Sequence, residues 1–458
     1  MWFMVCSLFQ KGISFLTTPI FARLLSTEEF GIYNVFTTWL QTMTIFSTFR
    51  LDYSVFNKGM SKYPDRRDEY TSSMLGLTTI INTVLLTLYF IFREPINQFS
   101  ELNTVLFLCM FLQLYFIPAI NFWSLRQRYE FKYRLVVAVT LLMTVSNAVF
   151  GVLAVLSFEN KALARISAGV LVEAIIGIVI YIMVMLKGGV FWNREFVNFA
   201  ILFNIPLMPH YFSSYIVDQS DKIMIQKLIS FSAAGLYSLA YTVGGVVRIF
   251  ISALTNTLIP LQYRLLEKKR YDDLNRQICG VMIGVTGLIV SMNLIAPELV
   301  YILGEKKYLP AVGVMPPVMA SVYCSFLYTL LANIEFFFNK NKFATKISFV
   351  GAAVNVVLNF LLIPVFGYVA AAYTTLICYI IYALGHLFYV RKVALAEEKV
   401  IILDFGRLIL LGILTTALSI VLGFLYPFFV VRYILLFCVF LIALSKRKTI
   451  FAFIQNMK

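Results

Sequence analysis

The sequence is divided into fourteen apolar runs, most of which have the length of a membrane-spanning helix. About 20 apolar residues are needed to cross the hydrocarbon core of a bilayer as an α-helix. Lipid offers no partner for backbone N–H and C=O groups, so a helix, which pairs these groups internally, is the expected conformation. The runs lie at approximately residues 2–22, 31–56, 72–92, 103–124, 134–156, 163–186, 201–227, 233–258, 278–302, 312–336, 346–364, 369–390, 403–425 and 428–445. We therefore expect an all-α polytopic membrane protein with about fourteen transmembrane helices.

The composition supports lipid as the solvent for most of this chain. Of the 458 residues, 60% are hydrophobic and 13% are charged, whereas soluble domains are nearer half apolar and a quarter charged. The net charge of +15 would suggest nucleic acid in a soluble protein. Here the basic residues lie mainly in short gaps between apolar runs, which is typical of cytoplasmic loops. We therefore expect the lipid bilayer, and no nucleic acid, as a partner.

The sequence contains no recognisable pattern for catalysis or metal binding. Its six cysteines are scattered without ligand spacing, and there are only two histidines, so we expect no metal and no cofactor. A glycine-rich phosphate loop of the P-loop type is also missing. We predict that the protein is not an enzyme.

Lysine and arginine predict the orientation in the membrane. Most of those in the loops lie in one alternate set, for example between residues 57 and 67 and between residues 264 and 276. Because such a bias marks the cytoplasmic side, both termini are predicted to be cytoplasmic. The chain begins almost inside its first apolar run, so we expect a short basic leading segment to be missing from it.

An internal repeat divides the chain. "ARLLSTEEFGIYNVFTTW" at residues 22–39 matches "QKLISFSAAGLYSLAYTV" at residues 226–243, with an offset of 204. "WSLRQRYEFKYR" matches "EFFFNKNKFATK" at an offset of 212, which also aligns Asn147 with Asn359. Parallel repeats are typical of transporters with alternating access. We predict two pseudo-symmetric six-helix bundles around a central cavity, at residues 1–190 and 200–395, followed by two helices at 400–445 and a cytoplasmic tail at 446–458.

Polar residues recur on corresponding faces of the first two helices of each repeat. At 100° per residue, the four stripes are Lys11, Ser14 and Thr18; Asn34, Thr38, Gln41, Thr48 and Asp52; His210, Ser214, Asp218, Asp221 and Lys222; and Ser238, Thr242, Gly245, Arg248, Ser252 and Asn256. Individual serines and threonines are expected to bond helix carbonyls or neighbouring helices. The charged residues are expected to face a polar lumen, because a charge facing lipid is costly.

Four basic residues are predicted to make that lumen cationic and suited to a phosphate or pyrophosphate group; they are Lys11, Arg50, Lys222 and Arg248. The alternative for Arg50 is an interfacial position reached by snorkelling, and snorkelling is also expected for Arg432. Asp218 and Asp221 either pair with Lys222 or bind a coupling proton or sodium ion. Glu173 and Glu335 are intramembrane acids without an identifiable partner, and we expect Glu335 to lie at the interface.

Two long stretches resemble a known family. "QKGISFLTTPIFARLLSTEEFGIYNVFTTW" from Gln10 and "DQSDKIMIQKLISFSAAGLYSLAYTV" from Asp218 resemble Wzx-type oligosaccharide flippases of the multidrug/oligosaccharidyl-lipid/polysaccharide exporter superfamily. The resemblance implies movement of an undecaprenyl-pyrophosphate-linked oligosaccharide across the bacterial cytoplasmic (inner) membrane, for O-antigen, capsule or exopolysaccharide synthesis. It also implies basic residues around the head group, at positions comparable to Lys11, Arg50 and Arg248. H+ or Na+ as coupling ion and polysaccharide assembly proteins are the further partners it suggests.

Two other classes remain open. A drug or cation antiporter of the same superfamily is expected to have a cavity dominated by acids, which Asp218 and Asp221 favour but Lys11 and Arg248 oppose. A sugar-transferring membrane enzyme is expected to have a large outer loop with catalytic groups. The longest outer gap between the apolar runs is only about a dozen residues, which argues against the enzyme.

Overall fold

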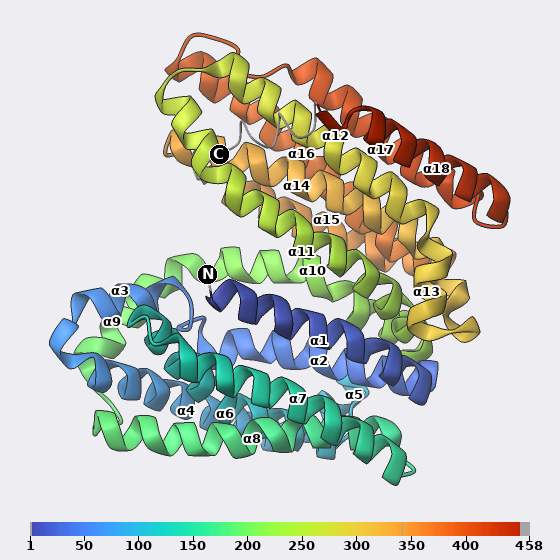
Figure 1. The fold of residues 1–458 in the computed structure, drawn as a ribbon. Helices are drawn as coiled ribbons and strands as arrows, with labels where there is room; N and C mark the ends of the chain where they lie inside the picture. Colours follow the sequence, from blue (N-terminus) through green and yellow to red (C-terminus); the bar gives the residue numbers. More distant parts are fainter. Residues whose placement is uncertain (1, 341, 449–458) are drawn as a thin grey trace. The chain divides into compact units, whose positions relative to one another are not determined.

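A computed structural model describes residues 2–340 and 342–448, although not the side chains of residues 2–11, 14, 210, 214 and 342. Within this part of the chain the structure contains eighteen α-helices, three 3-10 segments and no strand (Figure 1). The elements are α1 (Trp2–Leu24), α2 (Thr27–Thr48), α3 (Ser54–Lys62), η1 (Pro64–Arg66), α4 (Arg67–Ile91), α5 (Arg93–Ser100), α6 (Thr104–Tyr129), α7 (Tyr133–Ser157), α8 (Lys161–Gly188), α9 (Arg194–Asn204), η2 (Ile205–Leu207), α10 (Met208–Leu228), α11 (Phe231–Glu267), α12 (Tyr271–Leu294), α13 (Ala296–Gly304), η3 (Lys306–Val314), α14 (Met315–Phe337), α15 (Lys342–Phe366), α16 (Val369–Glu397), α17 (Phe405–Phe424) and α18 (Phe429–Ser445). The predicted all-α fold is confirmed.

Ten helical segments of the described chain are long and apolar enough to cross a membrane, and they coincide with ten of the fourteen predicted runs. They lie at Pro64–Ile91, Thr104–Tyr129, Tyr133–Ser157, Lys161–Gly188, Phe231–Glu267, Tyr271–Leu294, Lys306–Phe337, Phe343–Phe366, Val369–Glu397 and Phe405–Phe424. The described apolar parts of the first and last runs, Phe15–Leu24 and Phe429–Ser445, are shorter. The protein is therefore a multi-pass membrane protein.

The two remaining runs are each broken. The run at 31–56 is not one helix, because α2 ends at Thr48 and the backbone adopts positive φ angles at Phe49 (49°) and Arg50 (52°) before α3 begins. The run at 201–227 is interrupted by η2, which contains Pro206. Proline has no N–H to donate and its ring obstructs a continuing α-helix. Both predicted single helices were wrong.

The chain forms two compact units, Met1–Tyr215 and Ile216–Lys458, which are described separately. In unit 1, α6 and α7 pack on α8, α1 packs on α7, and α2 contacts both α6 and α8. An aromatic cluster fills one part of its core, where the ring of Phe56 stacks on Phe122 with centroids 5.1 Å apart and Tyr70 meets Phe196 edge to face at 5.5 Å. Buried rings of this kind contribute a large apolar area, so they hold α3, α4, α6 and α9 together.

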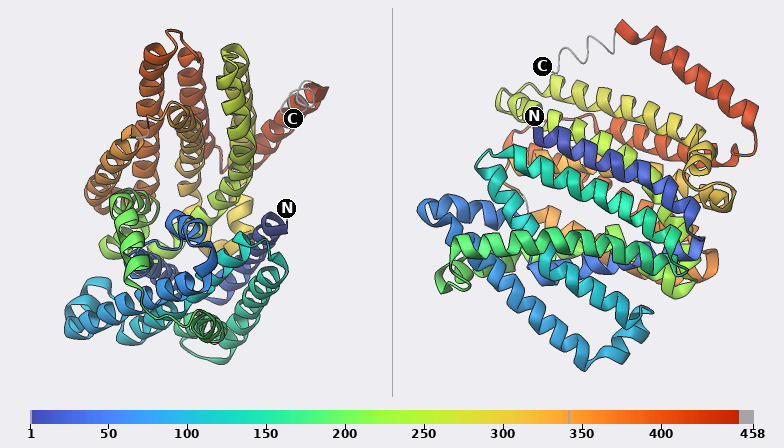
Figure 2. Two further views of the ribbon diagram at one scale, coloured as in Figure 1. Left: turned by 90° about the vertical axis from the view of Figure 1, so that its left-hand side faces the viewer. Right: turned by 60° about the horizontal axis from the view of Figure 1, so that its bottom comes forward.

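In unit 2, α14 packs on α16 and α11, α15 packs on α16, and α18 contacts α12 (Figures 1 and 2). The pairs α14–α16, α15–α16 and α11–α14 correspond, under the sequence offset, to α6–α8, α7–α8 and α2–α6 of unit 1. This correspondence is what a structural repeat requires. The bundle limits at 1–190 and 200–395 stay a prediction.

The repeated motif begins an equivalent helix in each unit. Ser26 precedes α2, and its hydroxyl accepts a hydrogen bond from the Glu29 N–H (3.1 Å) while the Glu29 carboxylate accepts from the Ser26 N–H (2.7 Å). Ser230 precedes α11 and accepts from the Ala233 N–H in the same way, at 3.1 Å. Such caps satisfy N–H groups that have no partner inside the helix. The aligned serines therefore have the same structural role.

Arg432, near the start of the last predicted run, does not reach water by snorkelling, as was predicted, because its side chain is buried inside the protein. Only 4% of it is exposed, and its two terminal nitrogens each donate to the Glu298 carboxylate at 2.7 Å. Nη1 also donates to the Leu294 carbonyl at 2.6 Å. A bidentate, charge-assisted pair of this geometry replaces the water that snorkelling would have reached, so it fixes α18 to α12 and α13.

Candidate functional site

A group of charged and aromatic side chains in unit 2 surrounds Arg248 on α11. Arg248 Nη2 donates to the Tyr241 hydroxyl at 2.6 Å, and the guanidinium carbon lies 4.8 Å from the centre of the Tyr241 ring. The two residues are seven positions apart, which is close to two helical turns and places them on one face. Arg248 Nη1 lies 3.6 Å from an Asp218 carboxylate oxygen on α10. Tyr241 thus orients the guanidinium toward Asp218.

The ion pair between Arg248 and Asp218 is accessible. The exposed fraction of the side chain is 28% for Arg248 and 45% for Asp218. The Tyr379 hydroxyl on α16 donates to the same Asp218 oxygen at 3.0 Å. A partly exposed pair at 3.6 Å lacks the short contact of a tight salt bridge.

Asp221 lies one helical turn further along α10 in a different environment. It is 2% exposed and accepts hydrogen bonds from the Tyr237 hydroxyl (2.6 Å), the Asn359 side-chain amide (2.7 Å) and the Thr375 hydroxyl (2.8 Å). These donors come from α11, α15 and α16. They compensate the cost of burying a carboxylate, and they tie α10 to three other helices.

Further oxygen and amide groups extend this cluster. The Thr374 hydroxyl donates to the Asn359 side-chain oxygen, and the Asn359 amide also reaches the Asn355 side-chain oxygen at 3.3 Å. The Ser220 hydroxyl donates to that Asn355 oxygen at 3.2 Å. Asp221 is therefore the single carboxylate in a network of neutral oxygen and amide groups on the described helices.

The alternative in which Lys222 pairs with the two acids stays a prediction, because Asp221 and Asp218 both act electrostatically on its ammonium group. Lys222 Nζ donates to the side-chain oxygen of Gln219 at 3.3 Å and lies 6.0 Å from the centre of the Tyr241 ring. The ion pair of Asp218 comes from Arg248, and the hydrogen bonds of Asp221 come from neutral groups. Lys222 thus lies beside Tyr241, at the edge of the same group.

Unit 1 holds the predicted Arg50 and Asp52 in a loop and not on a helix. The Arg50 guanidinium lies 4.7 Å from the centre of the Tyr53 ring and 5.5 Å from that of Tyr211, a geometry of favourable cation–π contacts. Asp52 accepts a hydrogen bond from the Asn121 amide at 3.2 Å. Because α2 has ended before them, Asp52 does not continue the helical stripe that was predicted.

The other predicted residues are less informative. Asn34 donates to the Phe30 carbonyl at 2.7 Å, and Thr38 bonds the Asn34 carbonyl at 2.8 Å, so both satisfy their own helix. Gln41 and Asn256 are exposed. The side chains of Lys11 and His210 lie outside the part of the protein that the structure describes.

The structure also adds residues that the sequence analysis did not select. Tyr241, Tyr379 and Thr375 contact the charged residues directly, yet tyrosines and threonines are common in membrane helices and carry no signal of their own. A weak signal existed for Asn359, since the repeat aligns it with Asn147. The polar partners of Glu335 and Glu173 are also visible: His386 for Glu335 at 2.7 Å, and Gln113 for Glu173 at 2.6 Å.

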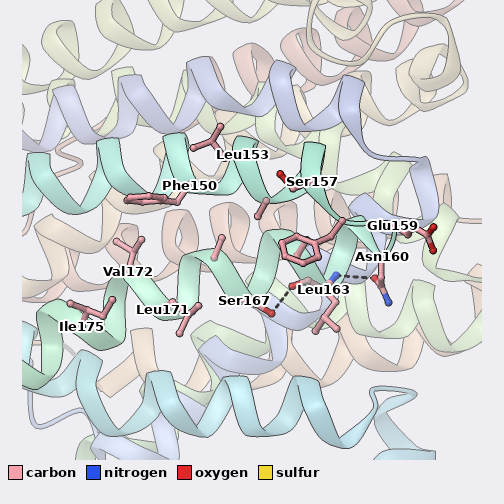
Figure 3. A pocket seen from close by; sticks show the side chains of 14 residues that line it. Phe150, Leu153, Ser157, Glu159, Asn160, Leu163, Ser167, Leu171, Val172 and Ile175 are labelled. Atoms are coloured by element: carbon pink, nitrogen blue, oxygen red, sulfur yellow. Dashed lines mark hydrogen bonds between the residues drawn. The ribbon is translucent and has the colours of Figure 1, made fainter.

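A different kind of hollow lies in unit 1 between α7 and α8. It has a volume of about 690 Å³, and Figure 3 shows apolar side chains such as Phe150, Leu153 and Leu171 along it, with Ser157 and Asn160 at one end. The hydroxyl of Ser167 bonds the Leu163 carbonyl at 2.8 Å and so is satisfied within its helix. The lining of this hollow is mainly apolar, and its polar residues are Ser157, Glu159, Asn160 and Ser167.

Comparison with known proteins places these features in context. A family model described as "Polysaccharide biosynthesis protein" matches residues 1–266. A protein of the Lsg locus of Haemophilus influenzae is 26% identical over 366 residues, which is 76% of this chain and 86% of that protein.

Solved structures share the fold. The lipid II flippase MurJ in an inward closed conformation is similar with a TM-score of 0.71 at 14% identity, over 97% of this chain and 99% of that one. An inward-facing multidrug resistance MATE family transporter of the MOP superfamily is similar with a TM-score of 0.60 at 10% identity, over 85% and 96% of the two chains. The fold is thus that of a multi-pass membrane transporter. Because the family model covers more than half of the sequence, the chain belongs to the polysaccharide biosynthesis protein family.

Proposed function

We propose that the protein is a flippase that moves an undecaprenyl-pyrophosphate-linked oligosaccharide across the cytoplasmic membrane of a bacterium. Family membership supports a role in making polysaccharide, and a flippase of a lipid-linked compound, MurJ, shares the fold. The observation that carries the proposal is the accessible Arg248, held by Tyr241 and only loosely paired with Asp218. O-antigen, capsule or exopolysaccharide synthesis is the process this activity serves.

Arg248 is proposed to bind the pyrophosphate of the cargo. Its planar fork of N–H donors matches phosphate oxygens better than the single Asp218 carboxylate at 3.6 Å. The incoming anion takes the place of Asp218, which keeps its hydrogen bond from Tyr379. Lys11, Arg50 and Lys222 are proposed as additional cationic contacts, and the tyrosine rings near Arg248 offer apolar faces on which sugars stack.

Asp221 is proposed to hold the coupling ion. Its carboxylate, with the Asn355 and Asn359 side chains and the hydroxyls of Thr374 and Thr375, supplies oxygen atoms from three helices. Hard cations such as Na+ prefer oxygen ligands of this kind, and a proton can equally neutralise a buried carboxylate. Binding of either ion changes the hydrogen bonds that connect α10 with α15 and α16.

Alternating access, a central cavity, cytoplasmic termini and contact with polysaccharide assembly proteins remain parts of the proposal. They rest on the sequence repeat and the distribution of basic residues.

A cation antiporter is the second candidate, because the MATE transporter shares the fold and Asp221 is a buried acid. The two functions are separated by leaflet exchange of a fluorescent undecaprenyl-pyrophosphate oligosaccharide in liposomes that contain the purified protein. Exchange that exceeds the protein-free rate supports the flippase. Uptake of a lipophilic cation without lipid exchange, under the same proton or sodium gradient, would support the antiporter instead.

A further inference from the structure

A second pair of titratable groups is buried in unit 2, away from the charges of α10. Glu335 near the end of α14 and His386 on α16 are 0% and 2% exposed, and Glu335 Oε1 lies 2.7 Å from His386 Nδ1. The Glu335 side chain is thus buried inside the protein and has a partner on α16. Its predicted position at the membrane interface stays a prediction.

The pair is incompletely satisfied. The second oxygen of Glu335, Oε2, is buried and has no hydrogen-bond partner among the described residues. Burial of an acid–base pair usually costs more than its attraction returns unless the remaining polar atoms are also bonded. A purely structural purpose is better served by two apolar side chains of similar volume. Histidine, in contrast, is the side chain that gains and loses a proton near neutral pH.

The surroundings of the pair are aromatic. The His386 ring stacks on Tyr328 of α14 with centroids 5.6 Å apart, and Phe343 of α15 meets it edge-on at 5.6 Å. Tyr382 of α16 meets the Tyr328 ring edge-on, with centroids 5.6 Å apart. Among the described residues, His386 is the titratable group that acts on Glu335.

The nearest basic residue along the chain is already engaged. Lys340 follows α14 and forms an ion pair with Glu397 at 3.0 Å. The proton count of the pair is therefore set by Glu335 and His386 themselves, with the hydroxyls of Tyr328 and Tyr382 as the adjacent titratable groups.

The same ring leads to the proposed cargo site. Tyr328 stacks on Tyr379 with centroids 6.0 Å apart and an angle of 14° between the ring planes. The Tyr379 hydroxyl donates to Asp218 at 3.0 Å, and Asp218 is the partner of Arg248. His386 and Asp218 are thus separated by two stacked rings inside one unit.

We propose that Glu335 and His386 form a proton-binding site whose occupancy opposes the binding of the cargo's phosphates at Arg248. The proposal rests on the proposed transport function. Before the proton binds, the ionised Glu335 carboxylate accepts a hydrogen bond from Nδ1–H of a neutral His386 imidazole. One proton taken from water adds to Nε2, so the ring becomes a cation that still donates to Oε1. The new charge draws the ring toward the face of the stacked Tyr328 ring.

That rearrangement shifts the His386 ring against Tyr328, and the stack passes the shift to Tyr379 and its hydrogen bond to Asp218. When the Tyr379 hydroxyl moves away from Asp218, the Asp218 carboxylate moves closer to the Arg248 guanidinium and competes with the phosphate for it. Coupling between two sites is reciprocal, so binding of phosphate must weaken the binding of the proton by the same factor.

The proton site can be tested without cargo because the chain contains only two histidines. The purified full-length protein, labelled with ¹⁵N-histidine and reconstituted in lipid, is titrated by NMR, and a His210→Gln variant identifies the signals of His386. The imidazole signals of the wild type are compared with those of Glu335→Gln, which keeps the size of the side chain. If the two groups form one proton site, loss of the carboxylate beside the imidazole should weaken proton binding about tenfold.

Inorganic pyrophosphate serves as the probe for coupling. Saturating pyrophosphate should lower the proton affinity of His386, and Tyr379→Phe, which keeps the stacked ring but removes the hydroxyl, should abolish that effect while His386 still titrates. Glu397→Gln is the matched control. Glu397, at the end of α16, is a partly exposed acid that pairs with Lys340, so the variant also replaces a glutamate of unit 2 by glutamine. It should leave the midpoint unchanged.

Leaflet exchange under a pH gradient completes the test. The wild type and Glu397→Gln should respond equally to the gradient, whereas Glu335→Gln should keep only the part of the response that the coupling ion at Asp221 supplies. A His386 midpoint that is unaffected by Glu335→Gln, or a gradient response as large in this variant as in the wild type, overturns the proposal. A wild type that titrates normally but exchanges no lipid under any gradient would instead contradict the proposed flippase function.

Discussion

Arg248 and Tyr241 form one unit on the face of α11, in which the tyrosine hydroxyl accepts a 2.6 Å hydrogen bond from Nη2 and the tyrosine ring lies 4.8 Å from the guanidinium carbon. This contact leaves Nη1 directed at Asp218, 3.6 Å away. The orientation of the guanidinium thus comes from its own helix, while its anionic partner, Asp218, comes from another helix. The proposal that the cargo's phosphates replace Asp218 depends on this combination.

Removal of the Tyr241 hydroxyl should weaken cargo binding without removing the cation. Tyr241→Phe keeps the cation–π contact but loses a hydrogen bond to a charged group, which contributes about 1.5 kcal/mol, so the apparent affinity for the lipid-linked oligosaccharide should fall about tenfold. The concentration dependence of leaflet exchange measures this. Tyr263→Phe on the same helix, where the ring packs against Phe337, is the control. Equal affinity in wild type and Tyr241→Phe would show that the hydroxyl does not orient Arg248.

Asp221→Asn should destabilise unit 2 and remove the response to a coupling ion. The new NH2 group faces hydrogen atoms of Tyr237, Asn359 or Thr375, and a buried donor without an acceptor costs about 1–3 kcal/mol. Thermal unfolding in detergent measures the first effect, and exchange under sodium or proton gradients measures the second. Asp218→Asn, at a side chain that is nearly half exposed, should cost little stability. A gradient response in a folded Asp221→Asn protein that is as large as in the wild type would exclude Asp221 as the ion site.

The pair between Arg432 and Glu298 should stabilise the attachment of α18. Arg432→Ala removes three charge-assisted hydrogen bonds and leaves Glu298 with 30% of its side chain exposed to find other partners. We expect a loss of about 2 kcal/mol in the free energy of unfolding. Arg407→Ala, an exposed arginine on α17, should leave stability nearly unchanged. If both variants unfold at the same temperature as the wild type, the pair does not hold α18.

A pH dependence is expected from the loop between α6 and α7. Burial opposes ionisation of Glu130, but the hydrogen bond from Lys132 at 2.7 Å and the charge of Arg126 lower its pKa below the usual value. The stabilisation is therefore complete above the unfolded-state pKa of about 4.3 and is lost as the pH falls through the lower folded-state pKa. Glu130→Gln should reduce the unfolding temperature at pH 7, and the difference from wild type should disappear at the acid end of a pH series. A difference that stays constant with pH would contradict an ionic origin.

The parts of the fold that hydropathy determines could be predicted from the sequence. Ten predicted runs coincide with long apolar helices, because the thickness and apolar nature of the bilayer core determine how long and how apolar a spanning helix must be. The break after Thr48 depends on two non-glycine residues, Phe49 and Arg50, in a left-handed conformation, and an apolar pattern carries no information about it. The break near Pro206 could have been predicted from the proline itself, but the run is apolar on both sides of it and was therefore interpreted as one helix.

The candidate site was predictable only in part for a similar reason. Charged residues in a membrane helix are rare and costly, so Asp218, Asp221 and Arg248 stood out on their helices. Their partners Tyr379 and Asn359 lie 161 and 138 residues further along the chain, and only the packing of α10 against α15 and α16 brings them near. The partner of Glu335 could not be predicted, because nothing in the sequence shows that α14 and α16 place it opposite His386.

The most direct test of the account is the rate of leaflet exchange of a fluorescent undecaprenyl-pyrophosphate oligosaccharide by wild type, Arg248→Ala and Arg276→Ala in liposomes. Arg276 is an exposed arginine on α12 in the same unit, so its variant removes the same charge away from the site. The account predicts fast exchange by the wild type and Arg276→Ala, and a rate near the protein-free background for Arg248→Ala. Equal rates for all three folded proteins would contradict the proposal that Arg248 binds the pyrophosphate.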